Sequence, residues 1–167
     1  MAAAEPQTEE SRLTRALDLA CAHVNRRERT VAEVRAHLER KGVAEATAAM
    51  AVGELIETRL LDDERFAAMY VADKRDLERW GNERIRRGLH ERGIDRELAE
   101  LALAATLGDS TDESETELDR ALELLRRRFP NPPRDRRERD RALGVLLRKG
   151  YESELAVDAL AAHARGD

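Results

Sequence analysis

Three short stretches of the chain end in nearly the same way, and this repetition restricts what the chain can fold into. They are LERKGV (38–43), LHERGI (89–94) and LLRKGY (146–151). Each has a leucine four positions before a glycine, a cation one position before it and an apolar residue one position after it. A cation stabilises the negative end of a helix, and glycine adopts the left-handed conformation that closes one. Each stretch therefore predicts a helix end.

Further columns agree when the three glycines, Gly42, Gly93 and Gly150, are aligned. Alanine follows every glycine at six and at nine positions, and valine or leucine follows at ten. Six columns in register indicate an internal repeat. The alanines recur at helical spacing, and small side chains let two helices approach closely. Each copy should therefore contain a helix, a glycine-closed turn and a second helix.

A longer helix is expected before each of these pairs. Apolar residues recur at helical spacing over 13–24, 66–77 and 118–125. Most of the 41% of apolar residues are alanine and leucine, which favours helices over strands. The predicted fold class is all-α: a tandem array of three three-helix repeat units, elongated because such arrays make contacts mainly between neighbours.

The predicted organisation follows the repeats and the charge distribution. The stretch GDSTDESETELD (108–119) carries six acids and no base, and PNPP (130–133) breaks the chain inside the third copy. The expected segments are a disordered leader (1–11), repeat one (12–61), repeat two (62–107), an acidic junction (108–117) and repeat three (113–166).

Features of secreted or membrane proteins are missing from the sequence. The acidic N-terminus MAAAEPQTEESR lacks the apolar run of a signal peptide, and no segment is apolar for long enough to span a bilayer. Cys21 is the single cysteine, so it cannot form an internal disulfide. It lies on the apolar stripe of the first helix and is expected to be a buried thiol. These features predict a cytoplasmic protein.

No pattern in the chain indicates catalysis or a cofactor. The four histidines lack the spacing of a zinc site, and no glycine-rich phosphate loop is present. Asp62, Asp63 and Glu64 could bind a metal, but acids in the first turn of a helix usually cap it. Asp62 is the expected cap, with Leu61 and Phe66 as a hydrophobic staple around it. The sequence therefore predicts a protein that is not an enzyme and holds neither metal nor cofactor.

The stretch LLDDERFAAMYVADKRDLERWGNERIRRGLHERGI (60–94) resembles the core signature of the RecX family of recombinase regulators. The matching elements are Leu61-Asp62-Asp63, Phe66-Ala67, Tyr70-Val71, Arg75, Gly81, Arg84-Ile85, Leu89 and Gly93-Ile94. The resemblance extends more weakly to ALDLACAHVNRRERTVAEVRAHLERKGV in copy one and RKGYESELAVDAL in copy three. It covers most of the chain after residue 12.

The resemblance implies a fold and a function. The family is known as tandem three-helix repeats whose members bind the nucleoprotein filament of the RecA recombinase along its groove. There they suppress its ATPase and strand exchange, which limits recombination and the SOS response to DNA damage. The expected partner is therefore a RecA-type recombinase filament, bound by a monomer. The net charge of −5, the acidic junction and the PNPP loop depart from the family. These departures weaken the case for independent DNA binding more than the case for filament binding.

Twelve residues are candidates for contact with the recombinase or its DNA. They are Lys74, Arg75, Arg79, Trp80, Arg84, Arg86, Arg87 and Arg92 in repeat two, and Arg134, Arg136, Arg137 and Arg139 in repeat three. A plainer interpretation makes the cations a solvated helix face paired with nearby acids, and makes Trp80 a packing residue.

Two other functions fit the same residues. Three-helix units can place a helix in a groove of DNA, so a free-standing helical DNA-binding protein is the main alternative. A helical scaffold that binds peptides is the other.

Overall fold

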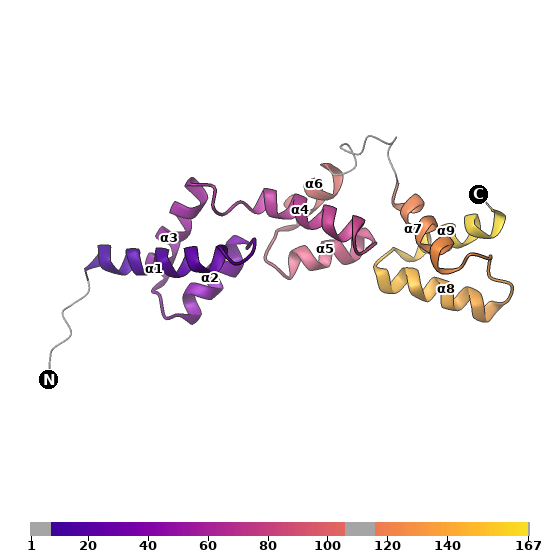
Figure 1. Ribbon diagram of the computed structural model, residues 1–167, viewed down its shortest axis with the longest axis horizontal. Coiled ribbons are helices and arrows are strands. Elements are labelled where there is room, and N and C mark those ends of the chain that lie inside the picture. The colour runs from indigo at the N-terminus through magenta and orange to yellow at the C-terminus, as the bar shows by residue number, and fades with distance from the viewer. Residues whose placement is uncertain (1–7, 106–115, 167) are drawn as a thin grey trace. The chain divides into compact units, whose positions relative to one another are not determined.

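The computed structural model describes residues 8–105 and 116–166, and in these ranges it contains nine α-helices and no strand. The helices follow one another in three groups of three (Figure 1). Repeat one holds α1 (Glu9–Val24), α2 (Val31–Arg40) and α3 (Glu45–Glu57). Repeat two holds α4 (Asp63–Asp76), α5 (Asn82–His90) and α6 (Arg96–Ala105). Repeat three holds α7 (Glu117–Arg128), α8 (Arg136–Lys149) and α9 (Ser153–Arg165). The all-α prediction is confirmed.

The ends of the expected segments differ in detail from the helices. The first helix begins at Glu9, capped by Thr8, inside the stretch expected to be a leader. The rest of that leader and most of the acidic junction lie outside the described residues. The PNPP segment lies between α7 and α8, where a break was expected. No helix among the described residues is both long and apolar enough to cross a membrane.

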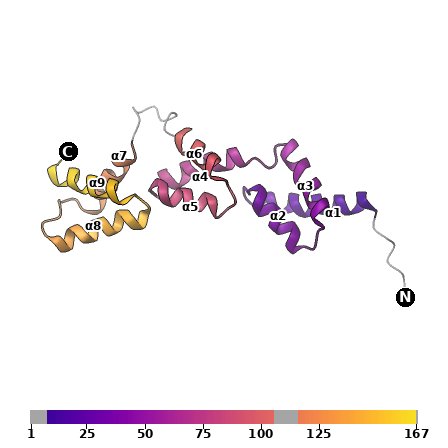
Figure 2. The same ribbon diagram turned by 180° about the vertical axis from the view of Figure 1, so that it is seen from behind.

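The described residues form two compact units. Unit one contains the residues up to Phe66 together with Arg92–Ile94, and unit two contains Ala67–Glu91 and the residues from Asp95 onward. In unit one, α1 packs on α2 and α3 around a core that includes Val34, Leu38 and Leu55. The front and back views show these three helices gathered together (Figures 1 and 2). Cys21 packs against this core but is only half-buried.

The repeated sequence columns have the structural roles expected of them. The glycines Gly42, Gly93 and Gly150 have φ of +73°, +81° and +88°, in the left-handed region. The leucines four positions before them are 0% exposed in all three copies. The alanines of both columns are buried, and in repeat three they let α7 and α9 pack closely. The columns therefore encode three copies of one helix–turn–helix.

The predicted start of α4 is also confirmed. Asp62 Oδ1 accepts the Arg65 N–H at 2.9 Å, and Leu61 and Phe66 are both buried. Asp63 Oδ1 accepts the N–H of Val31 at 2.9 Å, so both carboxylates bind backbone donors. At the other end of the helix the prediction was wrong. Leu77, expected on the buried stripe, is 79% exposed because α4 ends one residue before it.

A shared docking contact joins consecutive repeats. In unit one, Thr30 caps α2, and its hydroxyl donates to the carbonyl of Arg92 at 2.6 Å. In unit two, Gly81 caps α5, and its N–H donates to the carbonyl of Lys149 at 2.8 Å. Arg92 and Lys149 both directly precede the glycine of their turn. The glycine-closed turns of repeats two and three therefore dock on the start of the second helix of the preceding repeat.

The docking contact leaves no room for side chains at the turn. A Cβ on Gly93 would collide with Ala32, and a Cβ on Gly150 would collide with Arg84. Gly42 belongs to the first copy and has no preceding repeat, and a Cβ there would meet nothing within 4 Å. The glycine is therefore needed in all three copies because its backbone is left-handed. In the second and third copies it is also needed because the turn packs closely against the preceding repeat.

We predict that Gly150→Ala destabilises the protein more than Gly42→Ala does. Both substitutions place alanine in a left-handed conformation, which costs about 1 kcal/mol. At Gly150 the new Cβ also overpacks the docking contact, so a total loss of about 3 kcal/mol is expected. Urea unfolding followed by circular dichroism measures both losses, and Trp80 fluorescence follows unit two. Equal losses at the two sites would contradict the docking contact.

Candidate functional site

The candidate residues of repeat two surround the corner between α4 and α5. Arg79 has φ of +54°, and the Trp80 N–H donates to the Lys74 carbonyl at 2.9 Å, which turns the chain. Lys74 Nζ lies 4.9 Å from the centre of the Trp80 ring, and Arg84 Cζ lies 3.9 Å from it. Cations at these distances are attracted by the indole ring. The ring of the half-buried Trp80 thus interacts with two of the candidate cations, Lys74 and Arg84.

The same corner receives the turn of repeat three. Lys149 Nζ donates to the Glu78 carbonyl at 2.6 Å, and the Tyr151 hydroxyl donates to the Arg79 carbonyl at 3.4 Å. Arg84 Nη1 donates to the Arg148 carbonyl at 3.0 Å. The corner is therefore a joint between two repeats, which supports the packing interpretation of Trp80.

Arg75 lies in the interior and not on the surface. Its side chain is 3% exposed, and Nη2 donates to the carbonyl of Leu103 at 3.0 Å and to Asn82 Oδ1 at 3.1 Å. Asn82 in turn donates to both carboxylate oxygens of Glu117. Burial, with the nearby Arg120, lowers the pKa of Arg75 to about 10. This guanidinium is a structural part of the fold, and we exclude it from the proposed contact surface.

Two further candidates are engaged in ion pairs. Arg79 Nη1 lies 3.4 Å from the carboxylate of Glu123 on α7. Arg86 Nε lies 2.6 Å from Glu100 on α6, and Arg86 Nη1 lies 2.8 Å from Glu83. The hydrogen bond to Glu100 raises the pKa of Arg86. These cations are only partly available to a partner.

Other candidates are exposed. Four of them have side chains without a hydrogen bond or ion pair among the residues that the structure describes: Arg87, Arg134, Arg137 and Arg139. The Arg136 side chain is 96% exposed, and its Nε lies 3.9 Å from Asp140 Oδ2. Exposed ion pairs of this kind contribute little to the stability of the fold. Arg92 is half-buried, and its carbonyl accepts the Thr30 hydrogen bond. Among the twelve candidates, the cations most accessible to a partner are therefore Arg87 on α5 and the arginines near the start of α8.

Sequence reasoning missed a basic region in repeat one. The rings of His23 and His37 stack, with centroids 3.9 Å apart and an interplanar angle of 7°. Burial lowers the pKa of both rings, and cations lower them further. The cations that act on one or both rings are Arg26, Arg29, Arg40 and Lys41. The run NRRER (25–29) between α1 and α2 was the available signal.

We predict that both histidines titrate below their ordinary pKa of 6.5. A lowered histidine pKa means that the fold favours the neutral ring. The contribution to stability is therefore complete above pH 6.5 and is lost as the pH falls below it. NMR titration of the ring protons measures both values. Arg29→Gln should raise both pKa values, while Arg12→Gln should leave them unchanged. Unchanged values in Arg29→Gln would show that this cation does not act on the pair.

The described fold defines a class of protein: an all-helical chain of tandem three-helix units with many charged residues on its surface. Three family models match in the order expected for such an array. They are the first, second and third three-helix domains of RecX, at residues 16–55, 62–103 and 115–160. The chain belongs to the RecX family.

Two relatives named "Regulatory protein RecX" are similar along most of their length. The protein from Trichlorobacter lovleyi is 34% identical over 77% of this chain and 82% of its own length. The one from Mycolicibacterium vanbaalenii is 31% identical over 96% of this chain and 88% of its own. The crystal structure of RecX from Lactobacillus salivarius has a TM-score of 0.78 at 22% identity, covering 95% of this chain and 99% of that one. That structure supports the three-repeat fold.

Proposed function

We propose that this protein binds the nucleoprotein filament of a RecA-type recombinase and lowers its ATPase and strand-exchange activity. It thereby limits recombination and the response to DNA damage, acting in the cytoplasm as a monomer. The observation that carries the proposal is the ordered match to all three RecX domains, together with relatives named as regulatory proteins.

The repeat architecture supports a polymeric partner. A filament presents the same subunit surface many times, and this chain presents related three-helix units one after another. When one unit binds, the next is held at high local concentration near an equivalent surface, so individually weak contacts combine into tight binding.

The charges support binding to the filament over binding to naked DNA. The net charge is −5, and several candidate arginines are already bound to carboxylates or carbonyls of the protein. The negative net charge gives no general attraction to phosphate, and the arginines already bound within the protein release few counterions, so affinity for DNA alone should be low. DNA is then contacted mainly within the filament.

The proposal predicts a large difference in affinity between two partners. Fluorescence anisotropy in one buffer at physiological salt compares single-stranded DNA with the same DNA coated by recombinase. We expect the filament to bind at least about tenfold more tightly, because several units engage it at once. The ATPase of the filament should fall as the protein is titrated. If the protein binds bare DNA as tightly as it binds the filament, the proposal of a filament regulator is wrong, and a free-standing DNA-binding protein becomes the better interpretation.

We predict that the exposed cations, and not the buried one, affect binding. The double variant Arg87→Glu/Arg137→Glu should weaken filament binding about tenfold, since like charges then face the partner. Its helicity should not change, because both side chains are exposed. The exposed Arg96 lies on α6 of the same unit, and Arg96→Glu is the control that matches the charge change of the single variant Arg87→Glu. An equal effect of Arg96→Glu and Arg87→Glu would show a non-specific response to net charge.

Arg84 and repeat three are less suitable targets. Reversing the charge at Arg84 would break its contacts with Trp80 and the Arg148 carbonyl. Deleting repeat three would leave the N–H groups of Gly81 and Glu83 without their acceptors on Lys149 and Gly150. Either change would disturb the joint between repeats two and three as well as the surface proposed to contact the filament.

A further inference from the structure

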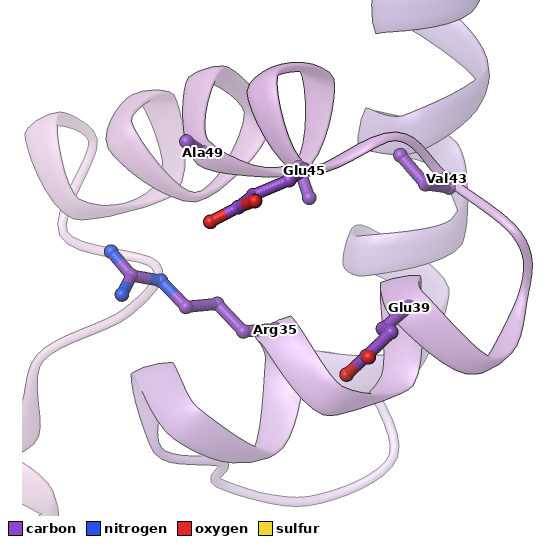
Figure 3. Close-up of a pocket in the computed structure, with 6 residues that line it drawn as sticks. Arg35, Glu39, Val43, Glu45 and Ala49 are labelled. Atoms are coloured by element: carbon purple, nitrogen blue, oxygen red, sulfur yellow. The ribbon is translucent and has the colours of Figure 1, made fainter.

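A groove with charged walls lies between α2 and α3 of repeat one (Figure 3). It is lined by Arg35, Glu39, Val43, Glu45, Ala48 and Ala49. The Arg35 side chain extends from α2 toward α3, where the Glu45 carboxylate points back toward it. The groove has a volume of about 530 Å³, within the range of binding pockets in proteins.

The charged side chains of this groove are not used by the fold. Arg35, Glu39 and Glu45 are exposed, and their side chains make no hydrogen bond or ion pair with the part of the chain that the structure describes. Arg79 and Arg86 of repeat two, by contrast, are both in ion pairs. The groove of repeat one therefore retains its capacity to bind charged groups.

Comparison of the repeats shows what this groove lacks. Arg35 and Arg86 each lie seven positions before the glycine of their turn, and Ala49 and Glu100 each lie seven positions after it. In repeat two the carboxylate of Glu100 bridges to Arg86 at 2.6 Å and ties α6 to α5. In repeat one, alanine replaces the glutamate. Arg35 thus lacks a carboxylate at the position from which Glu100 binds Arg86. Glu39 and Glu45 line the same groove, but among the described residues neither forms an ion pair with Arg35.

The corresponding positions of repeat three have a different chemistry. Leu143 and Val157 occupy them, so no ion pair is possible between those two side chains. Of the three copies, the first has the arginine at this position without its partner glutamate. An arginine fork that lacks its internal carboxylate is suited to bidentate binding of an external one.

We infer that the groove of repeat one binds a segment of a partner protein that supplies the missing carboxylate. The acidic side chain pairs with Arg35, and an apolar neighbour covers Val43, Ala48 and Ala49. The inference rests on the proposed function, in which the segment belongs to a recombinase subunit of the filament. It adds a protein contact for repeat one to the exposed cations of repeats two and three.

The charge of the groove favours a protein segment over nucleic acid. The walls carry one arginine and two glutamates, a formal charge of −1. A phosphate backbone would place further negative charge beside Glu39 and Glu45, which is unfavourable. A polypeptide can present one carboxylate to Arg35 and keep neutral or basic groups near the glutamates. The partner is therefore a mixed-charge protein surface.

The variant Ala49→Glu tests the inference by supplying the carboxylate within the chain. By analogy with Arg86 and Glu100, the new glutamate should pair with Arg35 and block the groove. We expect filament binding to weaken about tenfold, with the melting temperature unchanged or raised. Ala46→Glu is the matched control, because it adds the same charge to an exposed position of α3 that does not line the groove. Arg35→Ala removes the guanidinium proposed to bind the partner's carboxylate. This variant should weaken filament binding to a similar extent.

The outcomes separate this inference from the proposed function. If the unmodified protein does not bind the filament, the proposed function fails and the groove loses its proposed partner. If the unmodified protein binds and Ala49→Glu binds as tightly as Ala46→Glu, the filament function stands and the groove inference is wrong. If Ala49→Glu is weakened and the filament retains affinity for Ala46→Glu, the groove contacts the partner.

Discussion

The repeat architecture depends on one contact, in which the glycine-closed turn of repeat two or three docks on the helix start of the repeat before it. Gly81 and Glu83 donate backbone N–H groups to the carbonyls of Lys149 and Gly150, whereas Thr30 donates its side-chain hydroxyl to the carbonyl of Arg92. A helix start carries unpaired donors and a helix end carries unpaired acceptors, so each end satisfies the other. The helix dipoles also favour this pairing. One contact thus closes a helix and joins two repeats.

This contact also determines which cations remain available for a partner. Lys149 and Arg84 are drawn into the joint in unit two, and Arg75 is buried behind it. Arg79 and Arg86 are partly neutralised by glutamates. A chain rich in arginine can therefore offer fewer of these side chains to a partner than its sequence suggests, because several of them are engaged within the fold. The surface proposed for the partner consists of the exposed cations and the groove of repeat one.

Divergence between the copies gives the repeats different surfaces on the same framework. The buried leucine and alanine columns are shared, because they form the core and the close helix packing of every copy. The exposed column seven positions after the glycine is free to vary, and holds alanine, glutamate and valine in turn. A glutamate there forms an internal ion pair, whereas an alanine leaves Arg35 accessible. Small changes at exposed columns thus alter binding without altering the fold.

The sequence by itself determined the helices, the three ends closed by glycine and much of the core. These depend on local spacing: leucine, cation, glycine and alanine columns in register predict helix, turn and packing face, and Asp62 predicts a cap. The tertiary structure decided what the charged residues do. Arg75, Arg84 and Arg87 look alike in the sequence, yet one is buried, one stacks on Trp80 and one is exposed. The difference arises because the groups that surround each arginine come from distant segments: Arg75 binds the carbonyl of Leu103 on α6, and Arg84 binds the carbonyl of Arg148 in the next repeat. Contacts between distant segments carry no periodic signal along the chain.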